Sequence, residues 1–118
     1  MLPKENRLKK KKDLERVLKE GQTLKEGFLL LKILENDIAK RRFAFVVSKK
    51  ISKKAVLRNK VKRRLREIVR QRLKEIKKGI DGVFIALPGI EKENFSQIEK
   101  MVKKLFKKAN ILTTNNVE

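Results

Sequence analysis

Hydrophobic residues along this chain gather in short groups whose spacing predicts an order of helices and strands. The apolar positions from Leu14 to Leu18 are three and four apart, which is typical of one face of a short helix. Asp13 is placed to cap that helix, and Gly21 is placed to end it. Residues 1–12 are basic and lack such a pattern, so we expect a mobile basic arm or an irregular lead-in there.

Three runs of apolar residues favour strands. Residues 28–34 are almost all apolar and lie between a glycine and an Asn-Asp pair, which favours a strand buried largely on both faces. A turn at 36–40 separates this run from a second strand at 42–48, and the two strands are predicted to pair as an antiparallel hairpin. Residues 82–87 form the third strand, which a Pro-Gly pair would end.

Two longer segments have helical spacing. Residues 56–77 carry one apolar stripe, formed by Val61, Leu65, Ile68, Val69, Leu73 and Ile76. Asn94 with Gln97, or Ser96 with Glu99, can form the capping box of a final helix. Residues 110–118 are polar, and we expect a flexible tail.

Together these elements predict one domain that spans residues 1–118. The order is helix, two or three strands, long helix, strand and helix. This order is typical of an α/β fold of the two-layer α-β sandwich type, with helices packed against one small sheet. All six Phe side chains fall within apolar patterns and are therefore interpreted as core.

Charge narrows the class of partner. The 118 residues include 34 Lys and Arg against 14 Asp and Glu, a net charge of +20. Such a surface attracts RNA, DNA or an acidic membrane face. The chain has no Cys and no His, which excludes disulfides and thiolate chemistry. No motif indicates a self-contained active site, so no catalytic residue and no metal site is predicted. No apolar stretch approaches the about 20 residues of a membrane span, and we expect a cytoplasmic protein.

The positive charge is concentrated in the middle of the chain. Residues 49–78 hold fifteen basic and two acidic side chains, or 15 − 2 = +13. In a helix, Arg58, Lys62, Arg66 and Arg70 form one i, i+4 row that must point away from the core, with Asn59 and Arg63 beside it. Like charges in such a row repel, and a polyanion would relieve the repulsion. We expect RNA to contact Lys49, Lys50, Lys54, Arg58, Asn59, Lys60, Lys62, Arg63, Arg66 and Arg70.

The same segment carries a recognisable string. Arg-Asn-x-x-Lys-Arg-x-x-Arg-Glu stands at Arg58, Asn59, Lys62, Arg63, Arg66 and Glu67, after the sequence Ser48-Lys49-Lys50-Ile51. This string resembles the signature of the bacterial ribonuclease P protein subunit family. The basic start at 7–10, the short helix ending in glycine and the strand at 42–47 also have counterparts in that family.

The resemblance implies a fold and a role. The fold would be an α/β sandwich with a left-handed βαβ crossover, like the second domain of a ribosomal small-subunit protein, with an extra short strand near 22–24. The holoenzyme removes the 5′ leader from precursor tRNA. Its RNA subunit would carry the catalysis with Mg²⁺, and the protein, inactive alone, would bind that RNA and the leader.

The resemblance also implies a cleft between the first helix and the sheet that receives the leader. In this sequence the cleft would be lined by Leu14, Leu18, Leu29, Leu31 and Val46. Many members carry Phe at the first two of these positions and Tyr at that of Leu31. Leucine keeps an apolar surface there but provides no aromatic stacking.

Two other functions remain open from the residues alone. A structural, ribosome-associated RNA-binding protein would have the same class of partner without a processing role. A DNA-binding regulator could place the basic helix in a major groove, although no helix-turn-helix spacing is present. A membrane-surface role is weakest because the basic helix lacks interfacial aromatic residues. No obligate protein partner is evident.

Overall fold

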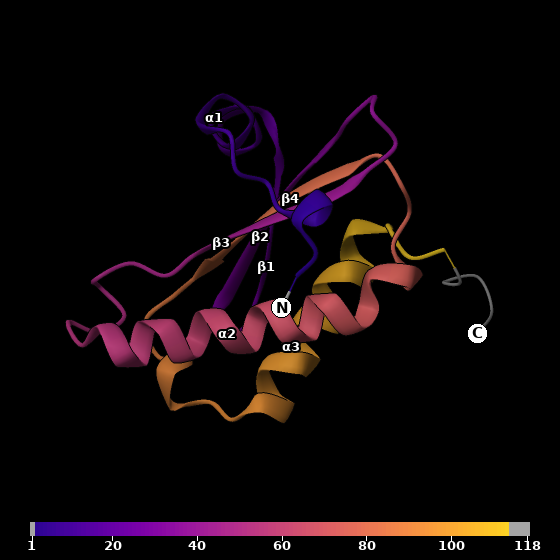
Figure 1. Cartoon of the computed structure of the whole chain (residues 1–118). Helices are drawn as coiled ribbons and strands as arrows, with labels where there is room; N and C mark the ends of the chain where they lie inside the picture. The colour runs from indigo at the N-terminus through magenta and orange to yellow at the C-terminus, as the bar shows by residue number, and fades with distance from the viewer. Residues whose placement is uncertain (1, 114–118) are drawn as a thin grey trace.

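The computed structural model describes residues 2–113 as a four-stranded sheet with helices on both faces (Figure 1). Across the sheet the strands follow the order β1 (Gln22–Glu26), β2 (Leu29–Glu35), β4 (Ile80–Ala86) and β3 (Arg41–Val46). One face carries α1 (Lys11–Glu20), and the other carries α2 (Ala55–Arg72) and α3 (Phe95–Ala109). Three short 3₁₀ turns complete the chain, η1 (Lys4–Asn6), η2 (Leu73–Glu75) and η3 (Ile90–Lys92). None of the helices within 2–113 is long and apolar enough to cross a membrane.

The pairing of the strands corrects one prediction. β2 pairs antiparallel with both β1 and β4, whereas β3 pairs in parallel with β4. The predicted hairpin between 28–34 and 42–48 is therefore wrong, because β4 lies between those two strands. The start of β4 is held there by the intervening turn: Asn36 N–H donates to Gly79 O (2.8 Å), and Ile80 N–H donates to Lys40 O (3.0 Å). Apolar runs predict strands, but they do not specify which strands become neighbours.

The other predicted elements are confirmed, with shifted ends. The extra short strand is β1, and β3, α2 and β4 form a parallel crossover whose left hand stays a prediction. α2 ends at Arg72 and passes into η2, so it is shorter than the predicted 56–77. The capping box of α3 is confirmed, because Gln97 N–H donates to Asn94 Oδ1 (2.8 Å) and Asn94 N–H donates to Gln97 Oε1 (2.9 Å).

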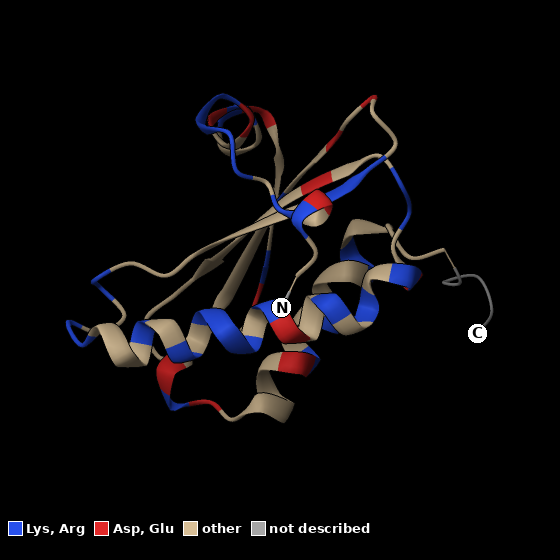
Figure 2. Ribbon diagram, viewed as in Figure 1, with Lys and Arg blue, Asp and Glu red and all other residues tan. Residues whose placement is uncertain are grey.

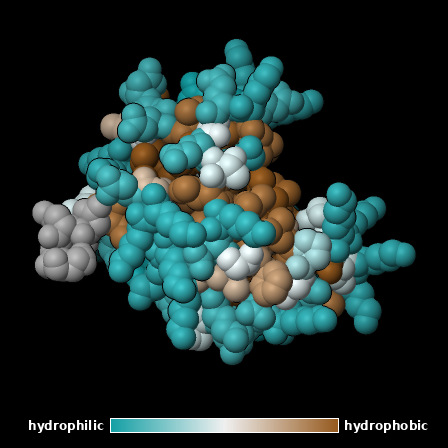
Figure 3. Space-filling view, turned by 180° about the vertical axis from the view of Figure 1, so that it is seen from behind, coloured by the Kyte–Doolittle hydropathy of each residue, from teal (hydrophilic) through white to brown (hydrophobic). Residues whose placement is uncertain are grey.

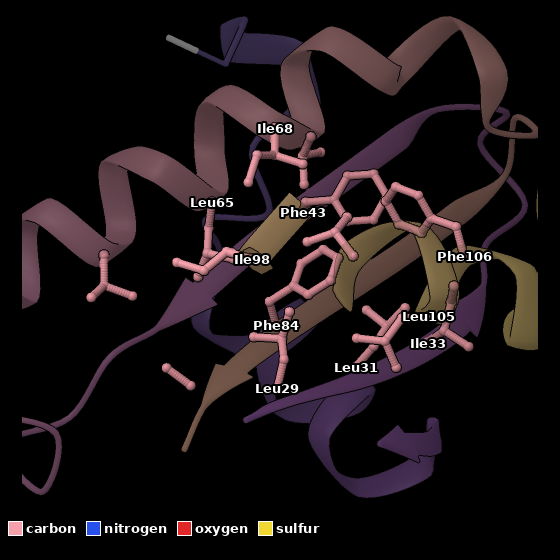
Figure 4. Packing of buried hydrophobic residues seen from close by; sticks show 14 of the residues in the cluster. Leu29, Leu31, Ile33, Phe43, Leu65, Ile68, Phe84, Ile98, Leu105 and Phe106 are labelled. Atoms are coloured by element: carbon pink, nitrogen blue, oxygen red, sulfur yellow. The ribbon is translucent and has the colours of Figure 1, made fainter. Parts of the chain in front are cut away.

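Alternation along β2 divides the apolar residues between two clusters. Leu29, Leu31 and Ile33 are buried against α2 and α3, while the residues between them are only half-buried on the α1 face. The prediction of burial on both faces therefore holds for β4, the central strand, but not for β2. Figure 4 shows the rings of Phe43, Phe84 and Phe106 packed at the centre of the larger cluster, with centroids 5.8–6.2 Å apart.

The two ends of the described chain are packed. Leu2 and Leu8 are buried, and Leu8 N–H donates to Phe43 O (2.9 Å), so of the two alternatives predicted for the start of the chain the structure has the irregular lead-in, along the edge of β3, and not the mobile arm. Ile111 is also buried, and its carbonyl accepts from Lys77 N–H (2.7 Å). The predicted flexible tail is thus wrong for 110–113, and its remainder, 114–118, lies outside the described residues.

A buried carboxylate joins α1 to the sheet. Asp81 of β4 is fully buried and accepts from Arg42 of β3 through two bonds, Nε to Oδ1 (2.9 Å) and Nη2 to Oδ2 (2.7 Å). Arg42 Nη1 also contacts Asp13 Oδ2 (3.3 Å), and Asn36 Nδ2 donates to Asp81 Oδ1 (2.8 Å). Asp13 therefore does not cap α1, which begins at Lys11, but fixes it to the sheet. Hydrogen bonding to Asp81 raises the pKa of Arg42.

Replacing Arg42 should markedly lower the urea concentration at which the protein unfolds. Arg42→Met leaves the Asp81 carboxylate buried without its cation, which is expected to cost about 3–5 kcal/mol. The matched control is Arg16→Ala, because Arg16 lies 3.9 Å from the same carboxylate but its side chain is 44% exposed. The control should cost less than about 1 kcal/mol. Urea titrations followed by circular dichroism measure both, and equal losses would contradict this role for Arg42.

Candidate nucleic-acid interface

Lys and Arg residues are frequent along α2 and in the loop that leads into it, where the ribbon of Figure 2 is blue at many positions. Lys49, Lys50 and Lys54 are exposed in this loop, as the sequence predicts. The loop is held by the buried side chain of Ile51 and by hydrogen bonds from Ile51 N–H to Ser48 O (3.0 Å) and from Lys54 N–H to Ser52 Oγ (3.1 Å). Three ammonium groups thus stand on an ordered turn beside the first turn of α2.

Two of the arginines on α2 have structural contacts. Arg64 Nη1 donates to Glu93 O (3.0 Å), and Arg72 pairs with Glu99 (3.1 Å) and Glu75 (3.4 Å). Both arginines therefore join α2 to the layer that contains α3. Neither was among the predicted RNA contacts, and their structural use agrees with that omission.

The predicted row of four cations is not uniform. Arg58 and Lys62 are half-buried, and Arg58 Nη1 donates to Ser52 O (2.8 Å). Arg70 is exposed, but Glu67 binds its guanidinium through two bonds of 3.0 and 2.6 Å. Of the row, Arg66 is the member that is both exposed and without a hydrogen bond or ion pair to another described residue.

The exposed side of α2 instead combines Arg66 with residues from the neighbouring row. Asn59, Arg63, Arg66 and Glu67 line a cavity of about 290 Å³. Within residues 2–113, Arg63 has no protein hydrogen bond or ion pair either, and Lys60 is exposed nearby. Two unpaired guanidinium groups one helical turn apart can each bind a phosphate through two hydrogen bonds, and the Asn59 amide can bond a base edge or a 2′-hydroxyl. We call the exposed surface formed by Asn59, Lys60, Arg63 and Arg66 the α2 surface.

Arg70 lowers the pKa of Glu67. The hydrogen bonds from Arg70 lower the pKa of Glu67 from 4.5 to about 2, against the opposing effect of desolvation. The folded-state pKa lies below the unfolded value, so the stabilisation is present above pH 4.5 and is lost as the pH falls through about 2. Above that range Glu67 is ionised and binds the Arg70 guanidinium, and Arg70 does not line the neighbouring cavity.

A carboxyl titration by NMR should show this pairing directly. We expect the Glu67 carboxyl to titrate with a midpoint near pH 2 in the native protein. In Arg70→Gln the midpoint should rise toward 4.5, since the main donor is removed. Lys60→Gln removes a charge two turns away on the same helix and should leave the midpoint near that of the native chain. A midpoint that ignores the Arg70 substitution would contradict the assigned cause.

A second surface lies on the opposite face of the sheet, beneath α1. Leu14, Leu18 and Val46 are half-buried there, in agreement with the predicted cleft. Figure 3 shows the hydrophobic band that this face leaves open between two hydrophilic regions. Leu29 and Leu31 were wrongly assigned to the cleft, because both are fully buried on the face that packs against α2 and α3.

The residues that β2 contributes to the cleft lie one position along the strand from the predicted ones. Since side chains alternate along a strand, Leu30, Lys32 and Leu34 face α1 and lie half-buried on the open side. Ala44 of β3 and Ile85 of β4 complete the floor. In the sequence the one sign of this alternation is Lys32, which interrupts a run of apolar residues. We call this surface the α1 cleft, formed by Leu14, Leu18, Leu30, Lys32, Leu34, Ala44, Val46 and Ile85.

The aromatic side chains are not all core. Phe43, Phe84 and Phe106 are buried as predicted, but Phe28 is 38% exposed, which contradicts its assignment to the core. Phe45 and Phe95 are half-buried. Phe28 precedes β2 and its ring covers Gly89, whose φ of +109° places it in the region that favours glycine.

Known proteins with a similar sequence or a similar fold point to one family. A sequence model of the family described as Ribonuclease P matches residues 2–110. The chain is 38% identical to the ribonuclease P protein component of Pseudanabaena sp., over 98% of this chain and all of that protein. Its fold is similar to a solved RNase P protein from Staphylococcus aureus (TM-score 0.83, 29% identity, 92% of this chain and 98% of that one). It is also similar to one from Thermotoga maritima (TM-score 0.78, 30% identity, 86% and 96%).

Proposed function

The chain belongs to the ribonuclease P protein family, and from this premise we propose that it is the RNA-binding subunit of a ribonuclease P in the cytoplasm. The observation that carries the proposal is the α2 surface, where Asn59, Arg63 and Arg66 of the family string stand together and exposed. The catalysis of tRNA 5′ maturation is assigned to the RNA subunit with its Mg²⁺. The protein alone is expected to be inactive.

The α2 surface would bind the enzyme RNA. Arg63 and Arg66 repel each other along one helical turn, and neither has an anionic partner among residues 2–113. Phosphates placed along this side of α2 would remove the repulsion and release condensed counterions, which favours binding. The ammonium groups of Lys49, Lys50 and Lys54 extend the same surface past the start of α2.

The α1 cleft would bind the 5′ leader of precursor tRNA. Its walls are aliphatic, so a single strand would contact them by apolar packing of base and ribose rather than by stacking on aromatic rings. Lys32 is the basic residue of β2 on this face, and its long stem can lie along the apolar floor while its ammonium meets a phosphate. Recognition of this kind depends little on leader sequence.

The other functions are not favoured. The curated relatives and solved structures reported above are ribonuclease P proteins, whereas a ribosome-associated protein or a DNA-binding regulator would be expected to match other families. The crossover fold also places α2 against the sheet along its apolar side, so the helix is not presented by a helix-turn-helix.

Cleavage of precursor tRNA by a bacterial ribonuclease P RNA tests the proposed function. At low Mg²⁺ and moderate salt we expect cleavage at the mature 5′ end only when both RNA and protein are present. Arg63→Ala with Arg66→Ala should weaken RNA binding and reduce the slope of log affinity against log salt by roughly two.

The control for this double variant is Lys25→Ala with Lys100→Ala, which removes the same charge from exposed positions on β1 and α3. Its salt slope should stay close to that of the native protein. Binding without any promotion of cleavage would contradict the assignment and return the ribosome-associated function to first place.

Two adjacent leucines test the proposed leader site. Leu30→Ala lies on the α1 cleft and should reduce the preference for precursor tRNA over mature tRNA several-fold, with a small change in stability. Leu31→Ala lies in the main core and should cost about 2–5 kcal/mol of folding free energy, while the preference of the folded fraction is kept. Equilibrium binding to both tRNAs, with urea titrations beside it, measures the contrast. Equal preferences in the native protein and Leu30→Ala would contradict the corrected cleft.

A further inference from the structure

A separate cavity of about 390 Å³ lies at the edge of β3, between the lead-in and α2. The lead-in, residues 2–8, passes the sheet on its way between α1 and α2 (Figure 1). The cavity, which we call the edge pocket, is within the about 300–1,000 Å³ that small-ligand sites have. Its lining residues are Leu2, Arg7, Leu8, Phe43, Ala44, Phe45 and Arg66.

Two guanidinium groups reach the edge pocket from different elements. Arg66 comes from α2 and is exposed, without a protein partner among residues 2–113. Arg7 comes from the lead-in, and its Nε donates to Leu2 O (2.9 Å), which fixes the side chain and leaves both terminal nitrogens for a ligand. No acidic residue lines this cavity. An anion with several oxygens, such as a phosphodiester, fits this pair of cations.

The wall between the cations is aromatic. Phe45 is half-buried, and its ring is stacked on that of Phe84 with centroids 5.8 Å apart and an angle of 4° between the planes. Phe45 packs against the main core but is only half-buried and lines the cavity, so part of this residue is open to a ligand there. Base stacking on such a ring is favourable for every base, because each has a π face.

The backbone of β3 adds hydrogen-bonding groups to the same wall. On the outer edge of this strand, Arg41 O accepts from Asn6 Nδ2 (2.7 Å) and Phe43 O accepts from Leu8 N–H (2.9 Å). Peptide groups two residues apart point to the same edge of a strand, so Phe45 N–H and C=O come next in this row. Among the described residues, the lead-in covers the edge at the first two positions and leaves the third open beside the cavity.

We propose that the edge pocket binds one unstacked nucleotide of RNA. The base lies against the Phe45 ring, its hydrogen-bonding edge meets the Phe45 peptide N–H and C=O, and Arg7 and Arg66 hold the phosphate. Every base has a donor beside an acceptor on its Watson–Crick edge, so this arrangement selects an unpaired nucleotide rather than a sequence. A peptide strand fits less well, because one open residue of edge between two cations offers too short a ladder.

The location of the edge pocket gives this nucleotide a role, and this step rests on the proposed function. Arg66 belongs to the α2 surface, while Leu8 and Ala44 belong to the cluster beneath α1. The pocket therefore lies where the two RNA-binding surfaces meet. The nucleotide comes either from the enzyme RNA on α2 or from the precursor in the α1 cleft, and the chemistry of binding is the same for both.

Chemical probing of the RNA at nucleotide resolution tests the inference on the reconstituted holoenzyme. Probing with protein and enzyme RNA alone, and then with precursor or leaderless tRNA added, shows which RNA supplies the nucleotide. We expect one unpaired nucleotide to be protected by the native protein at saturation. It should become reactive in Phe45→Leu, which keeps an apolar side chain, and in Arg7→Lys, which keeps the charge.

The two variants also separate binding from folding. Arg7→Lys changes no core side chain but removes the hydrogen bond to Leu2 O, so urea titrations of both variants must show a folded protein under the probing conditions. Loss of the same protection in two folded variants then reports binding. Each should lower affinity by about tenfold for the RNA that supplies the nucleotide. Lys9→Gln is the control, since Lys9 directly follows the lead-in, is exposed and does not line the cavity. The protection should persist in this variant.

The outcomes distinguish the two proposals. If the native protein promotes cleavage but both variants keep its protection pattern at saturation, the edge pocket is not a nucleotide site and the proposed function stands. If the native protein neither binds the RNA nor promotes cleavage, the proposed function fails and this inference fails with it.

Discussion

The arrangement of this molecule depends on one buried carboxylate. Asp81 is the fully buried charged side chain of the described chain, and it stands on the central strand β4 where β3, α1 and the turn after β2 converge. A charge in that position is tolerable only with partners on several sides, and Arg42, Asn36 and, through Arg42, Asp13 supply them. The same contacts place β4 between β2 and β3 and hold α1 over the sheet. Leu14, Val17 and Leu18 also pack this helix onto the sheet, and part of the sheet face beside it stays open as the α1 cleft (Figure 3).

The sequence predicted which segments form elements better than how they pair. Spacing located α3 and its capping box, because a helix start is decided by residues within four positions of one another. The pairing of β2 with β4 joins residues some fifty positions apart, and no local pattern contains it. The assignment of Leu29 and Leu31 to the wrong face of β2 has the same cause. Its run of leucines is apolar on both faces, so only the packing against α2 separates Leu29 and Leu31 from Leu30.

The sequence predicted which residues belong to the candidate site, but not which basic residues of α2 bind other parts of the protein. The family string lies on α2, where Asn59, Arg63 and Arg66 are exposed around one cavity, and their contact with RNA stays a prediction. Composition could not show that Arg64 and Arg72 hold α2 to the layer of α3, because their partners, Glu93 and Glu99, lie about thirty residues along the chain. The basic lead-in gave no signal of the edge it covers, since its two buried leucines, Leu2 and Leu8, form no strand or helix pattern with their neighbours.

The distribution of paired and unpaired arginines on α2 is the strongest physical argument for an RNA partner. If the positive charge on this helix served only to keep the protein in solution, lysine would serve as well as arginine. It would then not matter which of the arginines have partners in the protein. Instead, acidic or carbonyl oxygens of the protein engage Arg58, Arg64, Arg70 and Arg72, while Arg63 and Arg66 have none within residues 2–113. Leaving two forked cations one turn apart costs stability in the free protein. An anion with phosphate geometry along this side of the helix would remove that cost, next to the point where the α2 surface meets the α1 cleft.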